Sequence, residues 1–184
     1  MSAEAFITMG KQGFPLVLVD CALIADIDLS KVGADHEAEA VGHILTLADD
    51  YGLVFRIYRT PQGLRAICVS DKLRPSAPVS KRLLEDINSD WRYVRSARDI
   101  KFFSARLGGK PARMGIVVPA NFNYFALLPK EQREWDARYN AVSENYKSCE
   151  FILQTSECEM PSEIANFIAL HDERTKCFAN LPMA

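Results

Sequence analysis

Two aspartates separated by a single residue, Asp26 and Asp28, are the first side chains in the sequence whose spacing could support chemistry. On a strand, alternate side chains share a face, so both carboxylates would project from the same side of a sheet. Such carboxylates repel each other unless a cation lies between them, and carboxylate oxygens are typical ligands of Mg²⁺ or Mn²⁺. The spacing therefore predicts either a divalent-metal site or a solvated strand end.

Two arginines, Arg56 and Arg65, stand in or beside apolar runs that are typical of strands. A guanidinium group binds phosphate through two parallel hydrogen bonds, and an arginine buried without an anion or a carboxylate is costly. Both residues are therefore candidates for phosphate binding. The alternative is an ion pair with Asp20, Asp26 or Asp28.

A glycine-containing loop over residues 108–115 holds Lys110 and Arg113 and follows Arg106 directly. Small residues allow a backbone to approach a ligand closely, and the cations could then meet its phosphates. We therefore predict phosphate contacts from these three cations. The Walker pattern and the dinucleotide fingerprint do not occur in the sequence.

The three histidines give weaker indications. His36 and His43 lie seven residues apart on one predicted helix, but two histidines without a third ligand seldom make a zinc site. His171 falls on the apolar side of the last predicted helix, so we expect a buried and hydrogen-bonded core residue. No Ser-His-Asp or Cys-His arrangement is indicated.

The elements that position these residues follow from apolar periodicity and from turn residues. Residues before Pro15 are expected to be flexible. Strands are predicted within 15–29, at 53–60 and 64–70 as a hairpin, and at 102–107, 116–118 and 151–154; helices are predicted at 35–51, near 79–87 and 91–97, at 131–146 and from 161.

This order of elements predicts an α+β (mixed α/β) fold in which a single sheet with hairpins is covered by helices. The chain length is typical of one domain spanning residues 1–184. The predicted helix 131–146 has an aromatic stripe that includes Trp135 and Tyr139. That stripe would suit either the protein's own core or a partner.

Composition narrows the class of protein. Of 184 residues, 48% are apolar and 25% charged, which excludes a disordered or collagenous chain. No apolar run approaches the roughly 18 residues of a membrane span, so no membrane partner is expected. The N-terminus lacks the features of a signal peptide, and the five cysteines are scattered without a C-x-x-C pair. These features favour a cytoplasmic protein.

Charge is strongly partitioned along the chain despite a net charge of -2. Residues 1–50 carry 2 basic and 9 acidic side chains, residues 51–115 carry 14 and 5, and residues 116–184 carry 6 and 10. The basic central segment is typical of a surface that faces phosphates. Alternatively, its cations pair with the two acidic flanks.

The order of these motifs resembles that of the archaeo-eukaryotic primase-polymerase family. Leu23–Asp28 is similar to the family's first motif, an apolar strand with two aspartates separated by one residue. Asp99–Gly115 resembles its third motif, an aspartate followed by a basic stretch of the form R-L-x-G-x-x-x-K-x-G. Segments 55–65 and 170–175 also resemble bacterial or phage proteins of unassigned function.

The resemblance implies that Asp26, Asp28 and Asp99 hold one or two Mg²⁺ or Mn²⁺ ions as catalytic residues. It further implies that the cations hold a triphosphate or a template backbone; these are Arg65, Arg106, Lys110 and Arg113. In the family's second motif a glycine turn leads to a histidine, but Thr60–Arg65 has the turn and offers Arg65 in its place. Nucleotide binding is then expected to persist while nucleotidyl transfer is weak or absent.

The sequence therefore predicts a nucleotide-binding or nucleic-acid-binding domain of the primase-polymerase type, and it leaves open whether the chain is an enzyme. The alternative is a non-catalytic regulatory or protein-interaction protein. In that case the basic central face would dock on nucleic acid or on an acidic protein surface, or it would be neutralised internally by the acidic flanks.

Overall fold

The computed structural model describes residues 5–29 and 34–184, and within those ranges it has seven strands, five α-helices and two short 3₁₀ helices. In chain order the elements are β1 (Ala5–Met9), β2 (Pro15–Val19), β3 (Ile24–Asp28), α1 (Ala34–Tyr51), β4 (Phe55–Thr60), β5 (Gly63–Cys68), α2 (Pro78–Asp86), α3 (Trp91–Ile100), β6 (Phe103–Arg106), η1 (Pro111–Met114), η2 (Tyr124–Ala126), α4 (Pro129–Ser143), β7 (Glu150–Gln154) and α5 (Ser162–Thr175). The predicted helices and the β4–β5 hairpin are confirmed.

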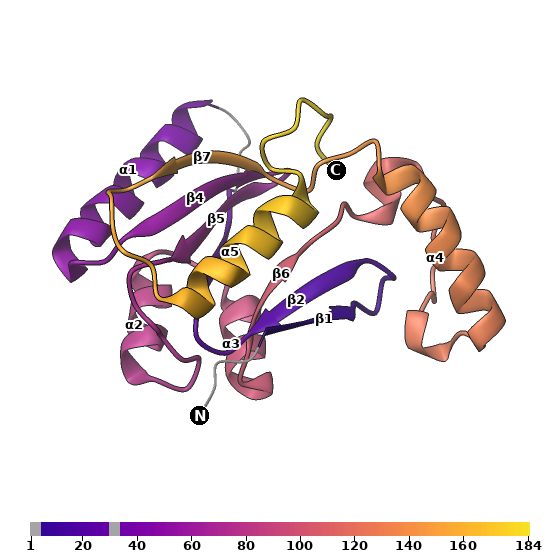
Figure 1. The fold of residues 1–184 in the computed structure, drawn as a ribbon, viewed down its shortest axis with the longest axis horizontal. Coiled ribbons are helices and arrows are strands. Elements are labelled where there is room, and N and C mark those ends of the chain that lie inside the picture. The colour runs from indigo at the N-terminus through magenta and orange to yellow at the C-terminus, as the bar shows by residue number, and fades with distance from the viewer. Residues whose placement is uncertain (1–4, 30–33) are drawn as a thin grey trace.

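The strands form two antiparallel sheets, with orders β1-β2-β6 and β3-β5-β4-β7 (Figure 1). The predicted α+β class is confirmed, but the expected single sheet is wrong. The apolar run 15–29 divides into β2 and β3, and a bend at 20–23 separates the two strands. Because β2 pairs with β6 whereas β3 pairs with β5, the chain enters two different sheets.

The start of the described chain is also more ordered than the sequence indicates. Residues 5–9 form the edge strand β1, in which Phe6 lies opposite Leu18 of β2. Phe6 and its neighbour Ile7 are both partly exposed, so β1 lacks the clean alternation of buried and exposed residues that marks a strand in sequence.

Helices cover both faces of the four-stranded sheet. Arg59 on β4 pairs with Glu37 of α1, whereas its neighbour Tyr58 donates a hydrogen bond to Asp172 of α5. Since adjacent side chains on a strand point to opposite faces, α1 and α5 lie on opposite sides of the sheet. Figure 1 shows α5 in front of the sheet.

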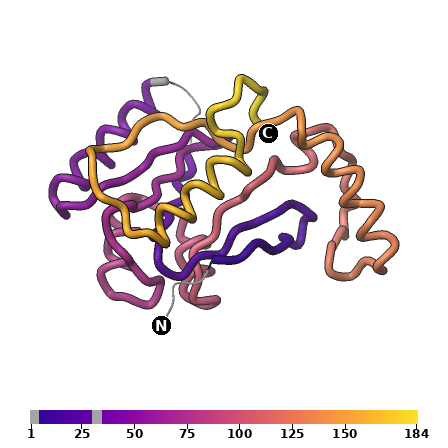
Figure 2. Tube along the Cα trace, in the orientation of Figure 1, coloured from indigo at the N-terminus to yellow at the C-terminus, as the bar shows by residue number. Residues whose placement is uncertain are grey.

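A second, smaller apolar cluster forms around α4, which lies at the opposite end of the molecule from α1 (Figures 1 and 2). Trp135 donates to the carbonyl of Gly13 at 2.7 Å, and Tyr139 donates to the carbonyl of Gly109 at 2.9 Å. These residues of the aromatic stripe therefore pack within the chain. The C-terminal residues return to the segment after α4, where Ala184 donates to the carbonyl of Lys147.

The predicted strand 116–118 is wrong. These residues form no strand in the structure. Ile116 is buried in the second apolar cluster, and Val117 is exposed to solvent. Within the described ranges, none of the helices combines the length and the apolar character that a bilayer crossing requires.

Candidate functional site

The candidate site begins where β3 and β5 pair. Asp26 lies directly opposite Arg65, and Asp28 lies opposite Gly63. Asp26 is half-buried and Asp28 exposed, and both carboxylates leave the same face of β3 as predicted. Gly63 permits this pairing, because a Cβ there would overlap the carbonyl of Ile27.

A cavity of about 400 Å³ opens between the two sheets beside Asp26 and Arg65. Its other walls come from the β1–β2 turn, from α3 and from β6, which brings Arg106. The lining residues are Gly10, Lys11, Gln12, Phe14, Leu16, Asp26, Arg65, Tyr93, Ser104 and Arg106.

Arg65 is nearly inaccessible to solvent, with 3% of its surface exposed. Its Nη1 donates to the Arg106 carbonyl at 3.2 Å and to His171 Nε2 at 3.1 Å. The buried Nε atom has no hydrogen-bond partner within the described residues, which also hold no carboxylate within ion-pair distance of this guanidinium. Arg65 lines the cavity, so its guanidinium is a charge without a carboxylate partner at the cavity wall.

His171 orients Arg65 without carrying a charge. Burial lowers the pKa of this histidine to about 4, so the imidazole is neutral at physiological pH. Its Nδ1 lies 3.0 Å from Asp172 Oδ1 and must hold the proton, which leaves Nε2 free to accept from Arg65. The prediction of a buried, hydrogen-bonded histidine is confirmed.

Asp172 anchors the other end of this network. Burial opposes its ionisation, but hydrogen bonds from His171 and Tyr58 together with the charge of Arg56 lower its pKa. Arg56 Nη2 lies 2.7 Å from Asp172 Oδ2, and its guanidinium stacks 4.4 Å from the centre of the Phe151 ring. Arg56, a predicted phosphate ligand, is thus in an ion pair, with a partner other than the three N-terminal aspartates considered from sequence.

Of the remaining predicted cations, Arg106 lines the cavity, whereas Lys110 and Arg113 are not among its lining residues. Burial, followed by the charge of Arg65, lowers the pKa of Arg106. Burial and then the charges of Arg106 and Arg113 lower the pKa of Lys110. The charges of Arg65 and Arg113 thus act on Arg106, and the charges of Arg106 and Arg113 act on Lys110. We call these four residues the cation cluster.

The cation cluster is only partly compensated. Burial lowers the pKa of Arg113, and the charge of Asp28 opposes that shift. Asp26 and Asp28 act in the same opposing sense on Arg106 and Lys110. Even so, none of the four cations has an ion-pair partner in the part of the chain that the structure describes. Arg113 Nη1 is another buried nitrogen without a partner there.

The glycines of the loop have a packing role that differs from the expected one. A Cβ at Gly108 would overlap the hydroxyl of Tyr139, and a Cβ at Gly109 would crowd Ala184. These positions are therefore small because α4 and the C-terminal residues pack against them.

Asp99 does not join Asp26 and Asp28. It lies on the exposed side of α3, pairs with Arg95 at 3.8 Å, and lines a different cavity. Across residues 5–29 and 34–184, no three His, Cys, Asp or Glu side chains are grouped so that they could hold a metal ion. The expected three-carboxylate centre is therefore not assembled there, and binding of Mg²⁺ or Mn²⁺ stays a prediction that rests on Asp26 and Asp28. His43, weighed above as a zinc ligand, lies 2.7 Å from the carbonyl of Asp86.

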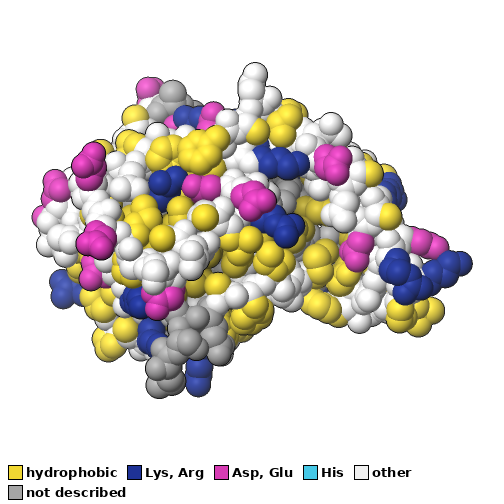
Figure 3. Space-filling model, viewed as in Figure 1, with side chains coloured by type: hydrophobic (Ala, Val, Ile, Leu, Met, Phe, Trp, Pro, Cys, Tyr) yellow, Lys and Arg dark blue, Asp and Glu magenta, His cyan; other side chains and the backbone are white. Residues whose placement is uncertain are grey.

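Among the described residues, four of the 14 cations of the basic central segment pair with carboxylates of the acidic flanks. The pairs between central cations and flanking carboxylates are Arg56–Asp172, Arg59–Glu37, Arg59–Glu150, Lys72–Glu163 and Arg74–Asp20. Figure 3 accordingly shows acidic and basic side chains interspersed on the face drawn. The cation cluster lies outside these pairs, as do the cations of α2 and α3.

Comparison with protein-family models, with curated proteins and with solved structures finds no match to this chain. The chemistry of the site must therefore be argued from its own geometry.

Several site residues were not singled out from sequence. The contact of His171 with Arg65 joins residues 106 positions apart, and no local pattern announces it. Lys11, Tyr93 and Ser104 reach the cavity from three separate elements. The one local signal was the adjacent pair of His171 and Asp172, because a histidine beside a carboxylate favours one tautomer.

Proposed function

We propose that this protein binds a nucleotide or a nucleic-acid end in the cavity between the two sheets, with its phosphates on the cation cluster. The observation that carries the proposal is that Arg65 and Arg106 line the cavity while neither has a carboxylate partner within the described residues. A phosphate would supply an anionic partner and would relieve the repulsion among the clustered cations.

The cavity suits the rest of such a ligand. About 400 Å³ is within the usual range for small-molecule sites. Phe14, Leu16 and Tyr93 provide an apolar wall for a base or a sugar, while Gln12 and Ser104 provide polar groups. The site thus combines an apolar wall with a cationic end, as a nucleoside phosphate requires.

Asp26 lines the cavity, and Asp28, two residues further along β3, lines a separate one beside α1. A divalent cation bound together with the ligand would lie between the two carboxylates. Mg²⁺ usually takes one or two protein carboxylates and completes its shell with phosphate and water. The ion would neutralise phosphate charge, and the two aspartates would hold it on the face of β3 nearest the cations. Because Asp99 is elsewhere, we propose a primase-polymerase-like binding domain in which nucleotidyl transfer is weak or absent.

Calorimetric titration with a nucleoside triphosphate, in Mg²⁺ and in EDTA, tests the binding. We expect Arg106→Gln to weaken affinity about tenfold or more, because a hydrogen bond to a charged group contributes roughly 1.5–3 kcal/mol. Arg65→Lys keeps the charge but removes Nε and should also weaken binding. Arg82→Gln, on the exposed side of α2, is the control. Equal affinity in all four proteins would refute the cavity as the site.

An extension assay with labelled nucleotide and with primed and unprimed single strands tests the catalytic question. We expect metal-dependent nucleotide binding without appreciable incorporation. Robust incorporation that disappears in the Asp26→Ala/Asp28→Ala double variant would instead establish an active enzyme that does not use Asp99 as a ligand.

The alternative, a non-catalytic protein that docks on an acidic protein surface, is distinguished by the ligand that it binds and by how its affinity depends on salt. Binding to a nucleic-acid backbone releases counterions, so the logarithm of affinity falls linearly with the logarithm of salt concentration. Tight binding of an acidic peptide with no measurable affinity for nucleotides would favour docking on a protein.

A further inference from the structure

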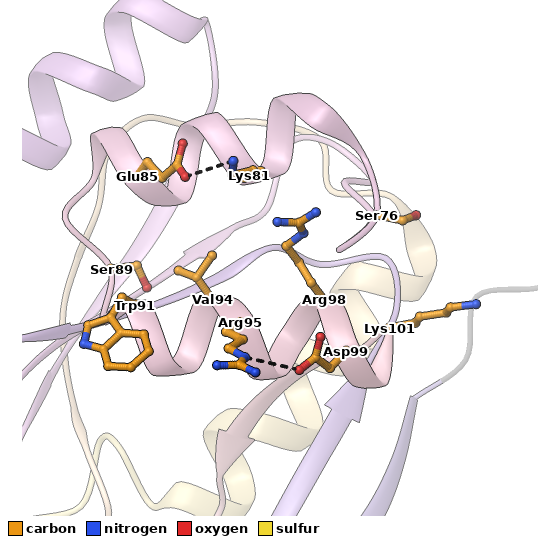
Figure 4. Close-up of a pocket in the computed structure, with 10 residues that line it drawn as sticks. All are labelled: Ser76, Lys81, Glu85, Ser89, Trp91, Val94, Arg95, Arg98, Asp99 and Lys101. Carbon is orange, nitrogen blue, oxygen red and sulfur yellow. Dashed lines mark ion pairs between the residues drawn. The ribbon is translucent and has the colours of Figure 1, made fainter.

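A second cavity, of about 530 Å³, lies between α2 and α3 and is separate from the cavity between the sheets. Figure 4 shows the residues around it, with Arg98 projecting into the space between the two helices and Trp91 at the beginning of α3. Its charged lining residues are the cations Lys81, Arg95, Arg98 and Lys101 and the carboxylates Glu85 and Asp99. We call this cavity the α2–α3 groove.

Trp91 is unusually exposed for a tryptophan, with 65% of its surface accessible. The buried side of α3 is formed by Val94 and Ala97, so the indole is not needed for that packing. The guanidinium of the neighbouring Arg92 lies 5.4 Å from the centre of the indole ring. An exposed aromatic ring beside cations is the arrangement that stacks nucleic-acid bases.

Arginines follow one another along α3 at three-residue intervals, at positions 92, 95 and 98, and Lys101 comes directly after the helix. Within the described chain, Arg92, Arg98 and Lys101 have no ion-pair partner. Arg95 pairs with Asp99 at 3.8 Å, and Lys81 pairs with Glu85 at 3.4 Å, and all four side chains are exposed. Exposed pairs contribute little stability, so these two cations remain able to contact a phosphate.

We propose that the α2–α3 groove binds single-stranded nucleic acid, with a base stacked on Trp91 and phosphates contacting Arg95, Arg98 and Lys101. The ten residues of α3 span about 15 Å, the length of roughly four stacked nucleotides. A planar hydrophobic ring at one end and cations along that length match the alternating bases and phosphates of a strand. An acidic peptide would use the cations and leave the indole without a stacking partner.

The groove and the cavity between the sheets lie on different sides of α3. Tyr93 lines the inter-sheet cavity, whereas Val94 lines the groove. Ser89 lines the groove too, and its hydroxyl donates to the backbone carbonyl of Asp26. A bound strand would thus lie across α3 from the proposed nucleotide. The groove does not depend on that ligand, so the two proposals can fail separately.

Fluorescence anisotropy with a labelled oligothymidine of about 12 nucleotides tests the groove. We expect Trp91→Ala to weaken binding about tenfold or more, as base stacking on an aromatic side chain predicts, and Trp91→Phe to retain part of the affinity. Phe125→Ala removes another exposed aromatic residue, outside the groove, and should change nothing. Arg98→Ala should weaken binding and reduce the slope of log affinity against log salt by about one, unlike Arg82→Ala.

Intrinsic fluorescence gives an independent measurement, because the chain has two tryptophans and Trp135 is buried. The oligonucleotide should quench the emission of Trp91, and the quenching should disappear in Trp91→Phe. Unchanged affinity in both Trp91→Ala and Arg98→Ala would overturn the proposal. So would equal binding of a polyglutamate peptide, because only general attraction of polyanions would then remain.

The two sites are distinguished by crossing the variants. Arg106→Gln should lose nucleotide affinity and keep oligonucleotide affinity, whereas Trp91→Ala should do the reverse. If Arg106→Gln alone abolished oligonucleotide binding, the strand would lie in the inter-sheet cavity, and the groove proposal would be wrong.

Discussion

At the scale of single residues, the informative feature is the chain of hydrogen bonds behind Arg65. Arg56 and Tyr58 hold Asp172, Asp172 holds His171, and His171 accepts from Arg65. Each step fixes the next side chain, so the guanidinium that faces the cavity has one orientation. Such networks are sensitive to the loss of any member, because the partners are buried.

Acid should weaken this network through His171. Its pKa falls from 6.5 to about 4 on folding, so between those values the unfolded chain binds a proton that the folded protein does not. The free energy of unfolding should therefore be fully retained above pH 6.5 and drop by roughly 3 kcal/mol as the pH falls to 4. Urea unfolding at a series of pH values measures this.

His171→Gln is the matched variant, since its amide can both accept from Arg65 and donate to Asp172 without titrating. We expect it to lack the decline between pH 6.5 and 4. The contribution of Asp172, whose pKa is lowered from 3.8, should be lost in both proteins only as the pH falls below that value. Identical profiles above pH 4 would show that His171 is not held neutral by burial.

At the scale of elements, the contact between the β1–β2 turn and α4 depends on Gly13. This residue has a φ of 73°, and a Cβ on it would overlap the indole of Trp135. Gly13→Ala should therefore combine backbone strain with overpacking and cost roughly 2–4 kcal/mol. Thermal or urea unfolding measures the loss.

Gly52→Ala separates the two causes. Gly52 ends α1 with a similar φ of 63°, but a Cβ there would meet open space. Its substitution should cost only the backbone strain, about 1 kcal/mol. A loss at Gly13 no greater than that at Gly52 would mean that the β1–β2 turn does not press on Trp135.

The elements that sequence reasoning located were those with their own local signals. The helix α1 ends at Gly52, and the β4–β5 hairpin turns at Pro61 and Gln62. The elements that it missed depend on distant partners. β1 is a strand because β2 offers an edge, and Ile116 is buried because α4 packs nearby.

The candidate site was predicted only in part, because some of its residues are also brought together by distant partners. The spacing of Asp26 and Asp28 and the basic loop were visible in the sequence. Arg65 lies opposite Asp26 because of the register between β3 and β5. The hairpin fixes only the register between β4 and β5. Asp99 was assigned by its place in a motif, but its helix turns it toward Arg95.

At the scale of the whole molecule, folding pairs part of the basic centre with the acidic flanks and leaves the cation cluster without an ion-pair partner among the described residues. Anions that bind the cluster should then stabilise the folded protein, because a ligand of the native state shifts the folding equilibrium. Phosphate should raise the Tm relative to chloride at equal ionic strength, by about 2–4 °C for each kcal/mol by which the bound phosphate stabilises the folded state at the concentration used.

Differential scanning fluorimetry of the wild type and of Arg106→Gln checks this expectation. The variant should respond less to phosphate, since it lacks one cluster cation. A phosphate response of the same size in both proteins would indicate general salt effects rather than occupation of the cluster.

The neutral imidazole of His171, which accepts from Arg65, affects how the cavity attracts a ligand. A carboxylate in that place would orient the guanidinium equally well, but it would also cancel its charge. An uncharged acceptor supplies the alignment alone. The charge of Arg65 is thereby not cancelled by its buried partner, which leaves it available to attract an anion into the cavity that it lines.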